Sequence, residues 1–476
     1  MFFVLDMKRS KLLMSKENPF SWKFVAPLYM GSTLNPINSS MIATALVPIA
    51  LFMHISVAKT TILVTVLYLA SSIAQPTSGK LSEEFGPRRV FLTGIIMILL
   101  GGLLGGIGKN LSMLLVARIL IGIGTSTAYP SAMLLIRKRA EAAGMSQPPG
   151  NVLGSLQIAG VVTSVLGLPI GGVLVGTMGW RSTFMINIPV ALVALVMAAL
   201  WIPKDNISTQ SGKTVFDILS RIDVIGIIEF AVMITSLLVF LFSLPKINWI
   251  TLGLTVVFGV ALVWWELRAK HPFIDIRLLG KNGPLTRTYL RFALITLCIY
   301  TVLYGVTEWL EAAHGIPSSE AGLLLLPMSI VSAVVLGPIS KRNLVRGPLI
   351  VCAVSSILAS AGVLILTAST PIIYILIITL IFGITMGTTA SSNQIALYTQ
   401  VSGDQIATAA GLFRTFGYIG SIASSAIIGV VFRTKVVDSG LHVIAVIMIV
   451  VSILALFITI FDRKLERIAG SAKTTS

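Results

Sequence analysis

The chain has 476 residues, of which 55% are hydrophobic and only 11% are charged. A soluble domain carries nearer about 25% charged residues, so this composition excludes a soluble protein and predicts a membrane protein. The formal net charge of +17 does not indicate nucleic-acid binding, because Lys and Arg lie in short loops between apolar runs and not in one basic stripe.

Apolar runs of about 20 residues, the length that a helix needs to cross a bilayer, recur along the chain. They lack the alternating polarity over about 10 residues that a membrane β-strand shows. The sequence therefore predicts an all-α polytopic membrane protein with fourteen transmembrane helices, at 23–52, 60–79, 89–108, 111–136, 150–177, 183–203, 222–244, 247–267, 288–312, 319–340, 347–368, 371–398, 405–432 and 439–461.

The distribution of basic residues predicts the orientation of these helices. An even number of helices places both termini on one side, and most of the 35 Lys and Arg residues lie on that side. Because basic loops face the cytoplasm, segment 1–22 and tail 462–476 are predicted to be cytoplasmic. The expected location is a cell membrane, the bacterial inner membrane in particular.

A charged stretch after the second predicted helix, GKLSEEFGPRR at 79–89, has a degenerate counterpart after the tenth, GPISKRNLVRGP at 337–348. The two stretches lie eight helices apart, whereas two joined six-helix halves would place them six apart. We infer that a helix pair is inserted between related halves. The predicted order is an N-terminal six-helix bundle, a cytoplasmic linker, the inserted pair, a second cytoplasmic linker and a C-terminal six-helix bundle, at 23–203, 204–221, 222–267, 268–287 and 288–461.

These features resemble the major facilitator superfamily, and within it the fourteen-helix branch of drug:proton antiporters, over essentially the whole chain. The loop signature of that superfamily is matched by Gly79, Leu81, Glu83, Gly86, Arg88 and Arg89. Two positions depart from it, because Glu83 replaces the usual Asp and Glu84 occupies a normally basic position. Further similar stretches are ARILIGIG at 117–124, GLPIGG at 167–172, GWRSTFMINIP at 179–189 and LFRTFGYIG at 412–420. The resemblance implies a secondary transporter that exports small hydrophobic or amphipathic compounds in exchange for protons.

The charged loop at 79–89 is predicted to act as a conformational latch. Its glycines permit a tight reversal and a close approach of helices. The acids and arginines can pair across a cytoplasmic gap in one conformation and separate in another. The alternative is a solvated basic turn that only orients the protein, although orientation gives no reason for Glu83 and Glu84.

Ionisable residues within helices are the candidates for proton coupling, because a charge at membrane depth is costly unless it faces a polar interior. The candidates are Arg118, Arg414, Glu229, Glu308 and Glu311. Glu308 and Glu311 share a helix face, and an interfacial position is their alternative. Glu229 lies in the inserted pair, where a structural role is equally compatible with the sequence. Arg291, near a helix end, is expected to extend its side chain to the interface.

The first helix departs from the resembled family. In NSSMIATALVP at 38–48, Asn38 occupies a segment where many relatives carry a membrane Asp. Asn38 cannot titrate, while Arg118 and Arg414 leave positive charge inside the helices. A transporter of small organic anions or metabolites is therefore the alternative function.

A mostly apolar substrate cavity with a few polar groups is expected between the halves. Its predicted lining is Asn38, Met41, Gln157, Tyr304, Trp309, Asn393, Gln394 and Phe413. In the fifth helix, the antiporter-like motif of Gly167, Pro169, Gly171 and Gly172 predicts either a bend or close helix packing.

The sequence favours a transporter over other classes. It contains no phosphate-binding loop, no metal-ligand spacing and no Ser/His/Asp set, so we expect no enzyme activity, no metal and no cofactor beyond a proton gradient. A non-transporting receptor on the same fold would be expected to carry an appended domain, and none is evident. The expected partners are the lipid bilayer, protons and a small-molecule substrate, without nucleic acid, and the expected functional unit is a monomer.

Overall fold

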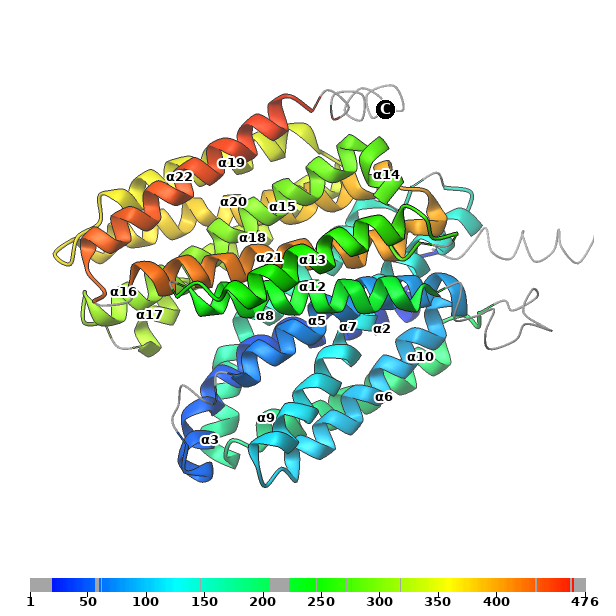
Figure 1. Ribbon diagram of the computed structural model, residues 1–476, viewed down its shortest axis with the longest axis horizontal. Coiled ribbons are helices and arrows are strands. Elements are labelled where there is room, and N and C mark those ends of the chain that lie inside the picture. Colours follow the sequence, from blue (N-terminus) through cyan, green and yellow to red (C-terminus); the bar gives the residue numbers. More distant parts are fainter. Residues whose placement is uncertain are drawn as a thin grey trace, which may run out of the picture.

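The computed structural model describes residues 19–55, 60, 62–145, 147–205, 222–244, 246–270, 272–274, 276–316, 318–432, 435–462 and 465. In this part of the chain all regular structure is helical (Figure 1). Most of the predicted segments 1–22, 204–221 and 462–476 lies outside these ranges. The predicted all-α fold is confirmed, and long apolar helices suit a bilayer because they satisfy their own backbone hydrogen bonds.

The amino-terminal half follows the first six predicted spans. Its helices are α2 (Trp22–Met41), η1 (Ile42–Ala45), α3 (Leu46–Met53), α5 (Ile62–Phe85), α6 (Pro87–Gly106), α7 (Leu111–Ala142), α8 (Gly150–Met178), α9 (Ser182–Met185) and α10 (Asn187–Trp201). The run from α2 to α3 forms one span, and α9 forms another with α10. Helix α8 is bent by 45° between Gly150–Ser164 and Pro169–Met178, as expected where a proline interrupts the helical hydrogen bonds.

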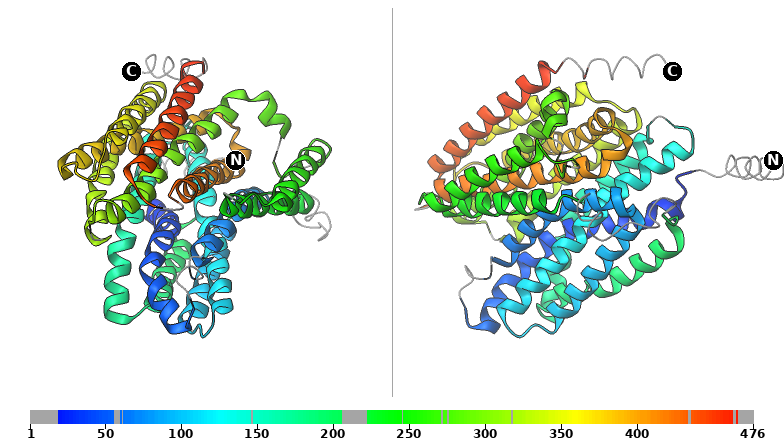
Figure 2. Two further views of the ribbon diagram at one scale, coloured as in Figure 1. Left: turned by 60° about the vertical axis from the view of Figure 1, so that its left-hand side comes forward. Right: turned by 45° about the vertical axis from the view of Figure 1, so that its right-hand side comes forward.

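The inserted pair consists of α12 (Val224–Ser243) and α13 (Trp249–Glu266), followed by the short α14 (Ile276–Lys281). Helix α12 packs against α13 and also contacts α5 and α21 (Ile406–Val431), which belong to different halves. Figures 1 and 2 show the pair at the side of the bundle, along the seam between those two helices.

The carboxy-terminal half has the same plan with more breaks. Its helices are α15 (Gly283–Thr301), the π-helical turn η2 (Val302–Val306), α16 (Thr307–Ala312), α17 (Ser318–Leu324), α18 (Leu326–Lys341), α19 (Arg346–Leu364), α20 (Ile372–Gln400), η3 (Gly403–Gln405), α21 and α22 (Asp438–Ile460). Several helices in the chain begin at an Asn cap, as at Asn282, whose side chain accepts a hydrogen bond from Leu285 N.

The helices of the structure match the predicted spans except at the tenth span, 319–340. Within the described residues, 12 helices are long and apolar enough to cross a membrane, or up to 13 if bent α8 counts as one span. The predicted span 319–340 is divided between α17 and α18, and α18 has only 16 residues. The break comes before Pro327, which has no backbone N–H to continue the α17 ladder and is well placed in the first turn of α18.

The two halves meet most closely at the face where α2 begins and α22 ends, here called the terminal face. There α5 packs against α21 and α8 packs against α18. Buried side chains from both halves form one apolar cluster in this part, whereas the remainder of each half has a cluster of its own. In Figure 1 the halves diverge toward the left, away from the terminal face.

Candidate functional site

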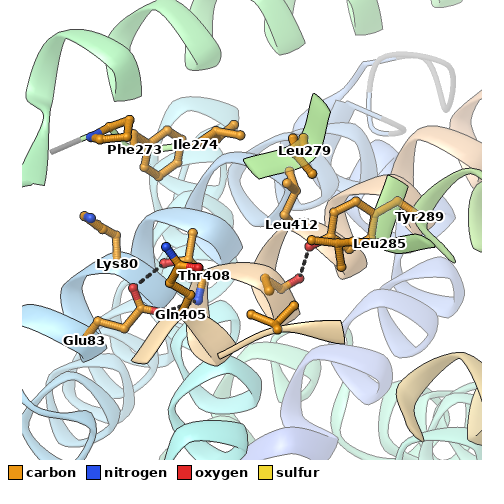
Figure 3. Close-up of a pocket in the computed structure, with 13 residues that line it drawn as sticks. Lys80, Glu83, Phe273, Ile274, Leu279, Leu285, Tyr289, Gln405, Thr408 and Leu412 are labelled. Carbon is orange, nitrogen blue, oxygen red and sulfur yellow. Dashed lines mark hydrogen bonds between the residues drawn. The ribbon is translucent and has the colours of Figure 1, made fainter. Parts of the chain in front are cut away.

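The terminal face is closed by a contact between Glu83 and the start of α21. Glu83 Oε1 accepts a hydrogen bond of 2.8 Å from the Thr408 backbone N–H, and Oε2 accepts one of 2.8 Å from Thr408 Oγ1. Figure 3 shows this pair beneath the segment that follows α13. The first turn of a helix has N–H groups without helical acceptors and a partial positive charge, so a carboxylate stabilises it. A helix of one half is thus capped by an acid of the other.

Two glycines bring the backbones of α5 and α21 into contact beside this cap. A Cβ atom at Gly79 would lie 2.6 Å from Thr408 Cα, and one at Gly411 would lie 2.6 Å from Pro76 Cα. Both distances are shorter than van der Waals contact, and the obstructing atoms are backbone. The predicted close helix approach therefore occurs here, between the halves.

The remainder of the charged loop is arranged differently from the predicted acid–arginine pairing. Gly86 has a φ of +96°, and the Asp205 carboxylate accepts hydrogen bonds from Arg88 N (3.3 Å) and Arg89 N (3.0 Å). Arg88 Nη2 donates to the Ala199 carbonyl at 2.6 Å. The first backbone N–H groups of α6 have no acceptor within the helix. Asp205, from the segment after α10, accepts their hydrogen bonds. Neither arginine pairs with Glu83.

The other loop positions belong to α5 itself. Leu81 is half-buried, and Glu84 lies in the last turn of the helix. The contact that this loop makes with the other half is therefore Glu83 with Thr408, a residue that the sequence prediction missed, and its action as a latch stays a prediction. A signal was present, because Thr408 lies at the start of the predicted thirteenth helix, where unpaired N–H groups attract an acid.

Farther from the terminal face, a polar network continues between the halves. Tyr418 on α21 donates to Asn35 Oδ1 on α2 at 2.9 Å and accepts from Gln75 Nε2 on α5 at 3.0 Å. Thr415 Oγ1 donates to the Ser72 carbonyl at 2.8 Å. These bonds extend the closed seam from the terminal face toward the middle of the bundle.

Arg414 lies where the seam reaches the middle of the protein. Its Nη2 donates to Gln157 Oε1 at 2.9 Å, and its guanidinium lies over the Tyr129 ring, 4.1 Å from the centroid. Its enclosed Nε has no hydrogen-bond partner, and Arg414 forms no ion pair within the described residues. A cation that lacks a carboxylate partner at membrane depth is able to bind an anionic or strongly polar group of a ligand.

Tyrosines from three helices gather next to this arginine. Tyr68 on α5 lies beside Tyr418, with 5.9 Å between ring centroids, and its hydroxyl is 3.4 Å from that of Tyr304. Tyr304 is 39% exposed and lies in the π-helical turn, next to Tyr300. π-helical turns are frequent at functional sites. The arrangement combines aromatic faces with hydroxyl groups, as a site for amphipathic ligands does.

Arg118 is buried within the amino-terminal half. Its Nε donates to the Leu63 carbonyl at 3.0 Å and its Nη1 to the Asn38 carbonyl at 3.2 Å, while the enclosed Nη2 has no partner. The Asn38 side chain instead forms a reciprocal amide pair with Asn187, at 2.7 and 3.0 Å. The position that resembles a membrane Asp is therefore occupied by a neutral pair.

The predicted acids lie apart from both arginines. Glu308 and Glu311 are exposed on α16, at the face opposite the terminal face. Glu229 is half-buried on α12, and its enclosed Oε2 has no hydrogen-bond partner. The structure does not bring these acids together with Arg118 or Arg414, so their role in proton coupling stays a prediction.

The predicted cavity lining divides into two groups. Gln157, Tyr304 and Gln394 contact the other half across the seam, and Gln394 Nε2 donates to Met133 Sδ at 3.1 Å. The others are enclosed by their neighbours and have little or no accessible surface: these are Asn38, Met41, Trp309, Asn393 and Phe413. Trp309 donates to Asp438, for example, and Phe413 stacks on Phe292 at 3.9 Å. The site near Arg414 is thus richer in tyrosine than predicted.

The antiporter-like motif of α8 serves both predicted purposes. A Cβ at Gly171 would lie 2.8 Å from the Met41 carbonyl, and one at Gly167 would lie 3.1 Å from the Ile37 carbonyl, so both glycines allow α8 to approach the first span. Pro169 begins the outer arm of the bend. Gly172 has no atom within 4 Å on the side where a Cβ would point.

One buried charge cluster differs from the prediction. Arg291, expected at the interface, is fully buried and donates to Asn393 Oδ1 at 2.9 Å. The buried Asp462, just after α22, lies 3.9 Å from Arg291 Nη1 and 3.5 Å from Arg287 Nη1. Asp462 holds the arginine inward because a buried guanidinium needs a counter-charge. The chain offered a signal, since this acid directly follows the last predicted helix.

A bundle of two halves, with a seam that closes one end and polar groups in the middle, is the architecture expected of a membrane transporter. The sequence profile of the Major Facilitator Superfamily matches residues 28–425, and the chain belongs to this superfamily. The predicted family is confirmed.

Two relatives match most of the chain. The uncharacterized MFS-type transporter YwoD of Bacillus subtilis (strain 168) is 30% identical over 464 residues, which cover 95% of this chain and 98% of the relative. The tetracenomycin C resistance and export protein of Streptomyces glaucescens is 27% identical over 429 residues, covering 88% and 77% of the two chains. The names of such relatives point to the drug-efflux branch.

A solved structure shares the fold. The crystal structure of the human organic anion transporter MFSD10 (TETRAN) has a TM-score of 0.63 at 14% identity, covering 92% of this chain and 99% of that chain. The likeness is one of architecture.

Proposed function

We propose that this protein exports small hydrophobic or amphipathic compounds in exchange for protons, by alternating access. The observation that carries the proposal is the closed seam at the terminal face. There Glu83 caps α21, and Gly79 and Gly411 allow the backbones of α5 and α21 to touch. Away from the terminal face, each half has an apolar cluster of its own. One end of the transporter is thus closed by packing between the halves while the halves separate toward the other end, and a relative named for resistance and export supports the direction.

Basic loops face the cytoplasm, and their concentration at the terminal face supports placing this face on the cytoplasmic side of the membrane. Both termini then lie in the cytoplasm, in a cell membrane that we take to be the bacterial inner membrane. The conformation is the outward-facing one, from which an exporter releases its substrate. The proposed transporter works as a monomer, with protons, lipid and the small-molecule substrate as its partners and with no cofactor besides the proton gradient.

Glu308 is proposed as the proton carrier, with Glu311, Glu229, Arg118 and Arg414 as further candidates. Glu308 is exposed near the outer face, where it can exchange protons with the outer medium. The test is substrate-induced proton release in proteoliposomes, with Glu308→Gln compared against Glu320→Gln, a matched change of an exposed acid on α17. Loss of proton release in the first variant alone is expected, and unchanged release would remove Glu308 from the mechanism.

A second candidate function is transport of small organic anions. It is favoured by one observation, the half-buried Arg414, which forms no ion pair within the described residues. The two functions differ in a growth-inhibition panel of cationic biocides, neutral drugs and organic anions in a host that lacks its own efflux pumps. Protection against neutral and cationic compounds is expected, and protection confined to anions would overturn the multidrug proposal.

A further inference from the structure

Two acids are buried together where the inserted pair reaches the terminal face. Asp223, directly before α12, is 6% exposed, and Glu266, the last residue of α13, is 0% exposed. A Cβ at Gly226 would lie 2.6 Å from Glu266 Oε1 and 2.7 Å from Asp223 Oδ2, so both carboxyl groups crowd the same point. Two like charges this close and shielded from water strongly disfavour each other.

The hydrogen bonds distinguish the two carboxyl groups. Asp223 accepts from Gly226 N (3.1 Å), Trp265 Nε1 (2.7 Å) and Phe273 N (3.1 Å). Glu266 accepts from Ile274 N at 3.1 Å through Oε1, while its enclosed Oε2 has no partner. A buried carboxylate needs donors on its oxygens, because an unsatisfied charge is far costlier than an unsatisfied neutral group. The three donors on Asp223 and the single donor on Glu266 therefore fit an ionised Asp223 beside a neutral Glu266.

Among the described residues, the charged groups around the pair do not supply a bound cation. Lys80 and Glu83 of α5 line the pocket together with Phe273 and Ile274, and Lys80 acts on Glu266 electrostatically. Asp223 also acts electrostatically on Glu229 of α12, whose side chain would carry the same sign of charge. From α14, Arg277 donates to the Leu267 carbonyl. Within the described residues, neither Asp223 nor Glu266 forms an ion pair.

The pair holds the segment that covers the seam between the halves. The Phe273 and Ile274 N–H groups bonded to the two acids belong to residues that line a pocket of about 60 Å³ together with Glu83 and Thr408 (Figure 3). Phe273 also packs on Phe230 of α12, with 5.6 Å between ring centroids. The insertion thus reaches the Glu83–Thr408 cap through residues 272–274.

We propose that Asp223 and Glu266 form a proton-binding site, and that the bound proton keeps residues 272–274 seated over the Glu83–Thr408 cap. When Glu266 loses the proton to water, a second negative charge appears beside Asp223 in an enclosed space. Repulsion and the entry of water then release the segment and uncover the pocket. The inserted helix pair acts as a pH sensor for the seam, independently of which substrate is carried or which ion drives transport.

The proton itself is tested by infrared difference spectroscopy of the purified protein between about pH 5 and about pH 9. Wild type is expected to show a protonated-carboxyl band that is lost in Glu266→Gln and kept in Glu320→Gln. Asp223→Asn removes the neighbouring charge, so the band is expected to disappear at a lower pH than in wild type. Identical spectra for wild type and Glu266→Gln would overturn the proposal.

The link to the seam is tested with a cysteine at Gln405, a half-buried residue that lines the pocket. Both native cysteines, Cys298 and Cys352, are buried and are replaced by Ser. The rate at which a maleimide labels this cysteine from the terminal face is measured over the same pH range. The chain with Glu266 is compared with the Glu266→Gln variant. Ionisation of the thiol affects both chains equally, so the labelling rate with Glu266 divided by the rate with Gln at this position reports only the effect of Glu266. We expect this ratio to rise several-fold with pH. A constant ratio would refute the link, even if the infrared band confirms the proton.

Discussion

The smallest change expected to open the seam is Gly79→Ala. The added Cβ would lie 2.6 Å from both the Ala407 carbonyl carbon and Thr408 Cα. Carbon atoms pack at about 3.5 to 4 Å, so α5 and α21 must separate by about 1 Å. The obstructing atoms are backbone, and no change of rotamer relieves the overlap.

Overpacking of this kind costs about 1–3 kcal/mol. The cost arises only while α5 and α21 touch, so it falls on the closed form of the seam and not on the form that is open at the terminal face. We expect Gly79→Ala to shift the equilibrium between these two forms by about 5- to 150-fold toward the open one.

The assay is a double electron–electron resonance distance measurement in the cysteine-free chain. Spin labels at Lys138 and Lys341 report on the two halves, because both side chains are exposed near the terminal ends of α7 and α18. Gly79→Ala is expected to add a population with a longer distance. The control is Gly176→Ala, where the Cβ would meet no atom within 4 Å. The reasoning fails if both variants give the wild-type distribution.

Three further outcomes follow from the same contacts. Glu83→Gln weakens the charge-assisted bonds to Thr408, which are worth about 1.5–3 kcal/mol, and should lengthen the same spin-label distance; an unchanged distribution would count against the cap. Arg291→Met leaves the buried Asp462 with only the partly exposed Arg287 as a counter-charge within the described residues, so it should lower the free energy of unfolding by less than the about 3–5 kcal/mol that a fully unpaired buried charge costs, with partial recovery on adding Asp462→Asn; thermal unfolding in detergent checks both. Arg414→Gln should reduce uptake of anionic substrates into inverted vesicles at least about tenfold while sparing neutral ones, and equal losses would exclude an anion-binding role.

Local physical chemistry explains why part of the site was predictable. The loop signature located Glu83 and Gly79. Membrane orientation accounts for the basic residues of this loop but not for its acids and glycines, so these residues indicated a further role. Arg414 was recognised from its depth in a helix. The partner of Glu83, however, is 325 residues away at Thr408, and no local pattern specifies such a pairing.

The prediction for Arg291 was wrong because depth was counted along one helix. Asp462, from the end of another helix, holds the guanidinium inside. The predicted cavity residues Trp309 and Phe413 were placed by residue type, but both side chains satisfy their packing within one half.

The sequence by itself determined the membrane class and the helical fold, and it predicts a helix pair inserted between two halves. Each of these depends on the length, polarity or repetition of continuous stretches, which the bilayer selects one helix at a time. Only the tertiary structure decided what the charged groups do. The cap of Glu83 on α21, the amide pair of Asn38 and Asn187, and the crowding of Asp223 and Glu266 all join side chains from separate helices. Their energies depend on angstrom-scale distances that helix packing sets and that no single stretch encodes.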